Sequence, residues 1–263
     1  MANTIEYGQG AVNNTIGWGQ GAKVGGSSFS NTKSILLDGV DDAVLTNNAY
    51  THLSSGTAMT VSVWFKSSTY TTSGRLMFVG KHVEILQNSA SFSNTQGTFT
   101  YKVLGNFGNS FATMGGNTQS GVANLVDGNW HHICLTWDGS TTTAVVYEDG
   151  VAKITNTSAS GTLNSSTTEA YAVGAKNNGS NPINGTIDEP AIWTTALSAS
   201  DVTAIYNSGV PNNLNDSGVI STPPTTWYRC GDGDSAPTLL DNGSGGDDGI
   251  MRNFTTFSTD VPT

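Results

Sequence analysis

The sequence has 263 residues and a formal net charge of -10, from ten Lys and Arg against twenty Asp and Glu. Sequence-independent binding to DNA or RNA requires clustered cations, and the cations here are spread along the chain, which argues against a nucleic-acid partner. Charged residues are only 11% of the chain, against roughly 25% in ordinary soluble domains. Six Trp, nine Phe and eight Tyr supply more apolar bulk than a disordered chain carries, so we expect a packed core.

The sequence contains neither a membrane span nor a recognisable secretion signal. No stretch approaches the ~18 consecutive apolar residues that a spanning helix needs. The start, "MANTIEYGQG", has neither the basic region nor the apolar region of a signal peptide. We therefore expect a protein made in the cytoplasm, without membrane insertion, whose two cysteines, Cys134 and Cys230, are free thiols.

The first 30 residues differ in composition from the rest of the chain. They are rich in Gly, Asn and Gln, and "YGQGA" is echoed in "WGQGA". Such a segment cannot bury much of itself. We expect residues 1–30 to form an extended arm that becomes ordered only against something else; a flexible terminus is the alternative.

From residue 34 onward the pattern is typical of short strands and turns. "MTVSVWF" alternates and places Met59, Val61, Val63 and Phe65 on one face of a strand. Asp-Gly pairs along the chain fit tight turns, because Gly accepts the positive φ that hairpins require. The pattern predicts an all-β fold, a jelly-roll sandwich of two antiparallel sheets, with one short helix near 198–207.

The predicted helix lies in "LSASDVTAIYNSG". Ser198 can cap its first turn, and Asp201, three residues later, completes a pair that resembles a capping box. Val202, Ile205 and Tyr206 then fall on one face, and by this face we expect the helix to pack on the sheets.

The stretch "DGNWHHICLTWDGS" brings together His131, His132, Cys134 and Asp138, which are residue types that bind metals or act in catalysis. Side chains alternate along a strand, so His132 and Cys134 share one face and His131 lies on the other. Zinc ligands must converge at ~2.0–2.3 Å from the metal, and no second pair with zinc-like spacing exists. The stretch therefore predicts a hairpin strand without a metal or nucleophilic centre.

This hairpin and three further motifs resemble a known family. "DGNWHHICLTWDGSTTTAVVYEDGVA" is similar to the signature hairpin of laminin-G-like domains of the concanavalin A-like lectin/glucanase superfamily, which includes pentraxins. "SILLDGVDDAVL", "VSVWFKSS" and "NGTIDEPAIWTTALSASDVTAIYNSG" resemble its other motifs, in the family's order. Ala43, Pro190 and Trp193 depart from the residues usual at their positions. The resemblance implies a concanavalin A-like sandwich over 31–210.

The resemblance also implies a structural calcium ion near the chain ends. The matching positions are the acids of "DGVDD" and "TIDE", which makes Asp41 and Asp188 the candidate ligands, with Asp42 as a further one. Carboxylate and backbone oxygens suit a hard cation such as Ca²⁺. The alternative is that these acids only cap turns and that "IDE" is a packing motif.

Residues 211–263 resemble the beginning of the family's fold, although they follow the helix. "TWYRCGDGDSAPTLLDNGSGGDDGIMRNF" is similar to the aromatic strand, loop and second strand with which such domains start. A circular permutation, an exchange of residues 227–254 with a neighbouring copy, or a truncated second domain would explain this order. We expect the segment to complete a sandwich in its own chain or in a neighbour, and closure within the chain is favoured because it needs no partner.

The acidic residues do not suggest an enzyme. Glycosidases of the superfamily use two carboxyl groups ~5–9.5 Å apart, whereas Glu84, Glu148 and Glu169 are isolated in the sequence. A lectin would bind sugar through exposed aromatic residues together with Asn or Asp. The aromatic candidates for such contacts are Trp18, Tyr50, Tyr70 and Trp193. Core packing or assembly contacts are the alternative role for these residues.

The arm, the C-terminal segment and the missing secretion signal resemble virion proteins of tailed bacteriophages that carry laminin-G-like modules. This resemblance implies a non-enzymatic decoration or fibre component, located in the virion, that forms a homo-oligomer. Its arm would contact other virion proteins. The alternative is an adhesin that binds carbohydrate and attaches to host surface glycans.

Overall fold

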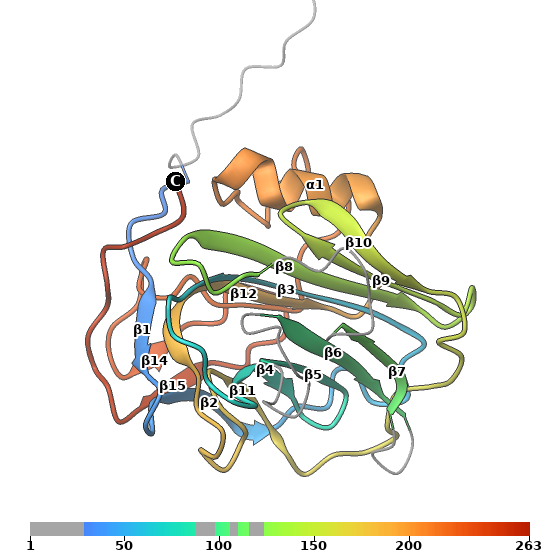
Figure 1. Ribbon diagram of the computed structural model, residues 1–263, viewed down its shortest axis with the longest axis horizontal. Helices are drawn as coiled ribbons and strands as arrows, with labels where there is room; N and C mark the ends of the chain where they lie inside the picture. Colours follow the sequence, from blue (N-terminus) through green and yellow to red (C-terminus); the bar gives the residue numbers. More distant parts are fainter. Residues whose placement is uncertain (1–28, 88–97, 106–109, 116–123) are drawn as a thin grey trace, which may run out of the picture.

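In the computed structural model of the chain, the described residues are 29–87, 98–105, 110–115 and 124–263. They form two antiparallel β-sheets packed face to face, with a short helix on the outside of one sheet (Figure 1). This arrangement confirms the predicted all-β sandwich. The predicted arm lies outside the described residues except for its last two positions.

The described strands form one seven-stranded and one eight-stranded sheet. In order across the first sheet, the strands are β1 (Ile35–Asp38), β12 (Asn184–Trp193), β3 (Ala58–Lys66), β8 (Trp130–Asp138), β9 (Thr143–Glu148) and β10 (Val151–Asn156), and β13 (Thr226–Trp227) also pairs with β12. In order across the second sheet, they are β14 (Thr238–Leu239), β15 (Gly249–Arg252), β2 (Ala43–Ala49), β11 (Ala170–Val173), β4 (Arg75–Val79), β5 (Val83–Gln87), β6 (Phe99–Leu104) and β7 (Ser110–Gly115).

The core lies between the two sheets and is built by alternation along the strands. Met59, Val61, Val63 and Phe65 of β3 are each fully buried, which confirms the predicted inward face. The opposite face of β3 is buried as well, since Trp64 is only 2% exposed. A second layer of structure therefore covers the outer side of this sheet.

That second layer includes α1 (Ala199–Tyr206), which lies on the outer face of the seven-stranded sheet (Figure 1). Asp201 N donates to Ser198 Oγ at 3.2 Å, and Ser198 N donates to the Asp201 carboxylate at 3.1 Å. The predicted capping box is therefore confirmed. Val202 and Ile205 are buried in the apolar clusters between the helix and the sheet.

A 3₁₀ turn, η2 (Asn207–Gly209), follows α1. In the parts of the chain that the structure describes, no helix has the length and apolar character needed to cross a membrane.

The predicted hairpin is present as β8 and β9, and His132 and Cys134 face outward beneath α1, each fully buried. His132 Nε2 lies 2.7 Å from Ser62 Oγ, and the His132 ring stacks on Tyr206 of α1 with ring centroids 6.1 Å apart. Cys134 and Cys230 are both free, as predicted, and the structure also buries both. The helix α1 thus shields His132 and Cys134 from solvent.

His131 lies at the start of β8 and contacts two carboxylates. Its Nδ1 lies 2.9 Å from Asp149 Oδ2, and its Nε2 lies 3.1 Å from Asp127 Oδ1. The other Asp149 oxygen accepts a hydrogen bond from the backbone N of His132, and His132 Nδ1 has no partner among the described residues. Ser62, His132 and Asp149 therefore do not form a nucleophilic triad, because the carboxylate does not orient the ring bound to the serine.

The C-terminal segment, 211–263, adds strands to both sheets of its own chain. β13 pairs with β12, whereas β15 pairs with β2 and carries β14 at the sheet edge. Tyr228 stacks on Tyr171 with ring centroids 5.6 Å apart, and Trp227 packs in one apolar cluster with Ile205 of α1. The segment is thus part of the sandwich and not a separate domain.

We predict that Gly249→Ala destabilises the fold, because β15 packs tightly against β2. A Cβ at this position would lie 2.6 Å from Val44 Cγ1 and 3.2 Å from Tyr228 Cε2, two buried side chains. Overpacking of this kind costs about 1–3 kcal/mol, which urea denaturation can measure. Gly218→Ala is the matched control, because a Cβ there would meet only the Asp216 side chain. Equal stability of the two variants would contradict the close packing of β15.

We predict that the free energy of unfolding falls with acidification because of two buried histidines. Burial lowers the pKa of His82 and of His132 to about 4, whereas an unfolded chain titrates near ~6.5. The unfolded chain therefore binds these protons first, and the loss develops as the pH falls from ~6.5 toward 4, up to roughly 3 kcal/mol per histidine. His132→Phe should give a shallower dependence of stability on pH in urea denaturation.

His131→Gln is the contrasting variant, because hydrogen bonding to Asp149 raises the pKa of His131. The stabilisation from a raised pKa is fully present below ~6.5 and is lost as the pH rises through the raised value. This variant should therefore lose more stability at acid than at alkaline pH. An unchanged pH dependence for His132→Phe would argue against a neutral, buried imidazole.

Candidate functional site

The outer face of the eight-stranded sheet carries a polar pocket of about 390 Å³. α1 lies on the other sheet, so it does not cover this face (Figure 1). The pocket is formed by β4 to β7 and by the two loops that flank β11. Its lining residues are Phe78, Lys81, Glu84, Lys102, Leu104, Ser110, Glu169, Lys176, Asn177 and Asn178.

Strand alternation explains why these side chains point outward. Val83 and Ile85 of β5 are fully buried in the core, so Glu84 between them faces the opposite side. In the sheet register, Glu84 lies directly opposite Phe78 of β4 and Lys102 of β6. The wall of the pocket is thus a row of neighbouring side chains on three adjacent strands.

Ion pairs hold both carboxylates of the pocket. Lys81 Nζ lies 3.2 Å from Glu169 Oε1. Glu84 Oε2 lies 3.2 Å from Arg75 Nη2 and 3.9 Å from Lys102 Nζ. Burial lowers the pKa of Arg75, and the charge of Glu84 acts against that shift. The carboxylates are thereby fixed in place as hydrogen-bond acceptors.

The loop after β11 supplies the third lysine and two amides. Lys176 N donates to Ser180 O at 2.9 Å, and Asn178 Oδ1 accepts from both the backbone N and the hydroxyl of Ser180. Among the described residues, no carboxylate pairs with Lys176. Amide and ammonium donors are therefore presented at the side of the pocket that faces this loop.

Sequence reasoning missed this pocket because it treated Glu84 and Glu169 as isolated. β11 and β5 lie on either side of β4, so the fold brings these two distant residues to one pocket. The alternation around Glu84 and around Lys102 predicts that both face away from the core. Nothing local in the sequence predicts that Glu169 joins them.

The aromatic residues proposed for sugar contact do not form a site. Tyr50 and Trp193 are each 1% exposed, so core packing, the alternative role for these residues, accounts for both. Tyr50 OH lies 3.0 Å from Thr226 Oγ1, and the Trp193 indole packs in the cluster beneath α1. Tyr70 is half-buried and does not line the pocket, and Trp18 lies outside the described residues.

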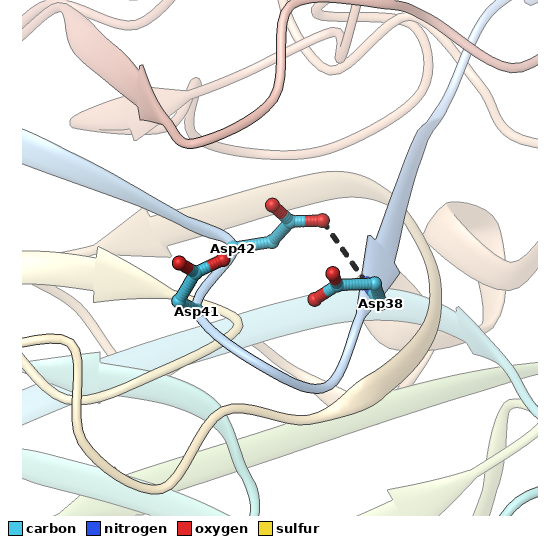
Figure 2. Close-up of side chains that lie close together, drawn as sticks. All are labelled: Asp38, Asp41 and Asp42. Carbon is cyan, nitrogen blue, oxygen red and sulfur yellow. Dashed lines mark hydrogen bonds between the residues drawn. The ribbon is translucent and has the colours of Figure 1, made fainter.

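Three aspartates lie together in the turn between β1 and β2 (Figure 2). One carboxylate oxygen from each of Asp38, Asp41 and Asp42 lies within 4.8 Å of the other two. Asp42 Oδ2 also accepts a hydrogen bond from Asp38 N at 3.0 Å. Burial raises the pKa of Asp42, and the carboxylates of Asp38 and Asp41 raise it further. Such closely spaced hard oxygens fit the ligand preference of Ca²⁺.

Asp188 lies elsewhere, so Asp41 and Asp188 cannot hold the same ion. The register of β1 and β12 pairs Asp38 with Asn184, and Asp188 is four residues further along β12, on the order of 13 Å away. Asp188 is fully buried and accepts hydrogen bonds from Asn31 Nδ2 at 2.8 Å and from the following backbone N at 2.9 Å. It therefore anchors the chain at the beginning of the described residues.

Glu189 and Asp188 form a buried acidic pair. Burial and the charge of Glu189 raise the pKa of Asp188 well above its usual range. Glu189 accepts a hydrogen bond from the Trp227 indole and lies 3.6 Å from Arg229 Nε. Arg229 in turn lies 4.4 Å over the ring of Phe29. These contacts join the N-terminal end of the described chain to the C-terminal segment.

Comparison with known proteins identifies the family. A family model described as the concanavalin A-like lectin/glucanases superfamily matches residues 38–203. No curated protein matches the sequence.

Solved structures share the fold at low sequence identity. A proposed carbohydrate-binding protein from Bacteroides ovatus has a TM-score of 0.67 at 14% identity, and the match covers 89% of this chain and 62% of that one. A heptameric SAP-like pentraxin from Limulus polyphemus has a TM-score of 0.50 at 15% identity, covering 84% and 94%. Domain 4 of an extracellular arabinanase from Geobacillus stearothermophilus, in complex with arabinotriose, has a TM-score of 0.49 at 22% identity, covering 66% and 76%.

The chain thus spans less than two thirds of the length of the Bacteroides ovatus protein. At their identities of 14% and 15%, the Bacteroides ovatus and Limulus polyphemus structures show the fold alone. The family model covers more than half of the sequence, including the hairpin, β12 and the first part of α1. The chain belongs to the concanavalin A-like lectin/glucanases superfamily.

Proposed function

We propose that this chain binds carbohydrate, without cleaving it, in the pocket on the outer face of the eight-stranded sheet. The observation that carries the proposal is the convergence of carboxylates, ammonium groups, amides and a hydroxyl in one pocket of about 390 Å³. Each sugar hydroxyl both donates and accepts hydrogen bonds, so a sugar site needs donors and acceptors of this mixed kind.

The pocket is also positioned on a rigid support. Glu84 and Lys102 stand on paired strands, and the ion pairs of Glu84 and Glu169 restrict both side chains before any ligand binds. Preorganised groups lose less conformational entropy on binding. Phe78 and Leu104 also line the pocket, with exposed fractions of 5% and 6%. The fold shared with the Bacteroides ovatus protein supports the same function.

Binding without cleavage fits the state of the two carboxylates. Glycoside hydrolysis requires one carboxyl group that delivers a proton and a second that acts as base or nucleophile. Here both Glu84 and Glu169 are engaged by cations. That pairing suits acceptors of hydrogen bonds from hydroxyl groups better than a proton donor.

Display of this module on a phage particle remains a proposal that rests on the resemblance of the arm and the C-terminal segment to virion proteins. In that setting, residues 1–30 would contact other virion proteins, and the pocket would face host glycans. Phe29, at the start of the described chain, stacks on Trp227 with ring centroids 6.3 Å apart. The arm would therefore leave the sandwich next to the C-terminal segment.

Calcium binding is proposed for the turn between β1 and β2, with Asp38, Asp41 and Asp42 as ligands. The close approach of their carboxylates supports it, since three negative charges in one turn repel one another unless a cation or protons compensate them. Such an ion would brace the turn.

We predict that filling the pocket abolishes carbohydrate binding. Ser110→Trp places a large side chain at an exposed lining position. On a glycan array, the wild-type protein should bind a defined set of oligosaccharides, and the variant should lose roughly tenfold or more of that affinity. Ser160→Trp is the matched control, because Ser160 is exposed but does not line the pocket. Absence of glycan binding by the wild type, or equal loss in both variants, would contradict the proposal.

We predict that CaCl₂ raises the melting temperature of the wild-type protein and that Asp41→Asn removes the effect. A ligand that binds only the folded state stabilises it by about 2.7 kcal/mol at 100 times its Kd. Asp188→Asn should keep the calcium response, because Asp188 lies away from the turn. If the melting temperature does not respond to CaCl₂, or if Asp188→Asn alone removes the response, the assignment of this turn is wrong.

A further inference from the structure

We infer that the pocket selects an acidic sugar, one that carries a carboxylate or a sulfate group. This inference rests on the proposed function, because it names the chemical class of the ligand in the same pocket. It is carried by the distribution of charge around the pocket and by the partners of each cation.

The pocket is a positive region on a strongly negative chain. Three of the ten cations, Lys81, Lys102 and Lys176, line it together with two carboxylates, a lining charge of +1 in a chain of net charge -10. Arg75 lies behind Glu84 and adds a further positive charge. Cations that are sparse elsewhere are thus gathered at one pocket, which attracts anions.

The lysines differ in how far their charge is already compensated. Lys81 pairs with Glu169 at 3.2 Å. Glu84 lies closer to Arg75, at 3.2 Å, than to Lys102, at 3.9 Å, so Lys102 is only weakly paired. Lys176 pairs with none of the described carboxylates. An anionic ligand can therefore bind Lys102 and Lys176 without first displacing a close ion pair.

The residues that the structure does not describe contain one acidic side chain. Residues 88–97, 106–109 and 116–123 contain neither Asp nor Glu, and Glu6 is the single acidic residue among residues 1–28. None of these three internal ranges can thus supply a side-chain carboxylate for Lys176.

The remaining polar groups suit the rest of a sugar ring. A carboxylate or sulfate would accept charge-assisted hydrogen bonds from the two lysines, which are stronger than neutral ones. The Nδ2 groups of Asn177 and Asn178 can donate to ring hydroxyls, since the Asn178 oxygen is engaged by its own loop. Glu84 and Glu169 can accept from hydroxyls and would repel a second acidic group. This arrangement favours sugars with one acidic group over polyanions.

The experiment measures binding of acidic oligosaccharides beside neutral counterparts on one array, followed by calorimetry. The probes are a galactose trisaccharide in which one residue is replaced by galacturonic acid, a singly sulfated galactose trisaccharide and the neutral galactose trisaccharide. The wild-type protein should bind one or both acidic probes roughly tenfold or more tightly than the neutral probe. A preference between carboxylate and sulfate identifies which acid the pocket takes. Added NaCl should reduce acidic binding more than neutral binding.

Lys176→Glu reverses the charge of the lysine that pairs with none of the described carboxylates, and it should reduce acidic binding roughly tenfold more than it reduces neutral binding. Lys153→Ala is the control, because Lys153 is exposed on β10 and does not line the pocket. Equal affinity for acidic and neutral probes, or equal losses of both in Lys176→Glu, would overturn the inference and leave carbohydrate binding intact. Failure of every glycan on the array to bind would overturn the proposed function together with this inference.

Discussion

The packing of α1 and the C-terminal segment against one outer face of the sandwich is the interaction on which the rest of the structure depends. A two-sheet sandwich has two outer faces, and in this chain they differ. The capping box at Ser198 begins the helix, and buried Val202 and Ile205 attach it to the seven-stranded sheet. The outer face of β3, with Trp64, thereby becomes a second core. On that side, His132 and Cys134 are closed off from solvent.

This packing buries His132 and Cys134 of β8. His132 and Cys134 would line an open surface if the helix were absent; beneath it, both are fully buried. Burial lowers the pKa of His132 and raises that of Cys134, so both groups are held neutral near neutral pH. Residue types that suggest a reactive centre in the sequence are therefore packing groups in the fold.

Sequence reasoning succeeds where the determinants are local. The capping box, the inward face of β3 and the alternation of β8 each depend on residues a few positions apart, and the structure confirms them. It fails where distant segments meet. The register of β1 with β12 separates Asp188 from Asp41, and the strand order around β4 brings Glu169 to Glu84. Neither juxtaposition follows from local pattern, since both are set by sheet order and register.

Charged residues are sparse in this protein, and the acids and the cations are placed differently. Several aspartates accept hydrogen bonds from nearby backbone groups, as Asp38 accepts from Val40 N at 2.8 Å. Of the pocket lysines, Lys176 pairs with none of the described carboxylates. A weakly charged sandwich with one cationic pocket on its uncovered face is suited to hold a ligand at its surface while the rest of the fold stays unchanged.

Hydrogen–deuterium exchange, measured with and without the best-bound oligosaccharide, tests the central claim that α1 covers His132 and Cys134 on one sheet and that the outer face of the other sheet receives the ligand. The account predicts slower exchange on ligand binding in β4 to β6 and in residues 176–178, with no change in α1. Slower exchange confined to α1, or to the turn of Asp38, Asp41 and Asp42, would contradict it.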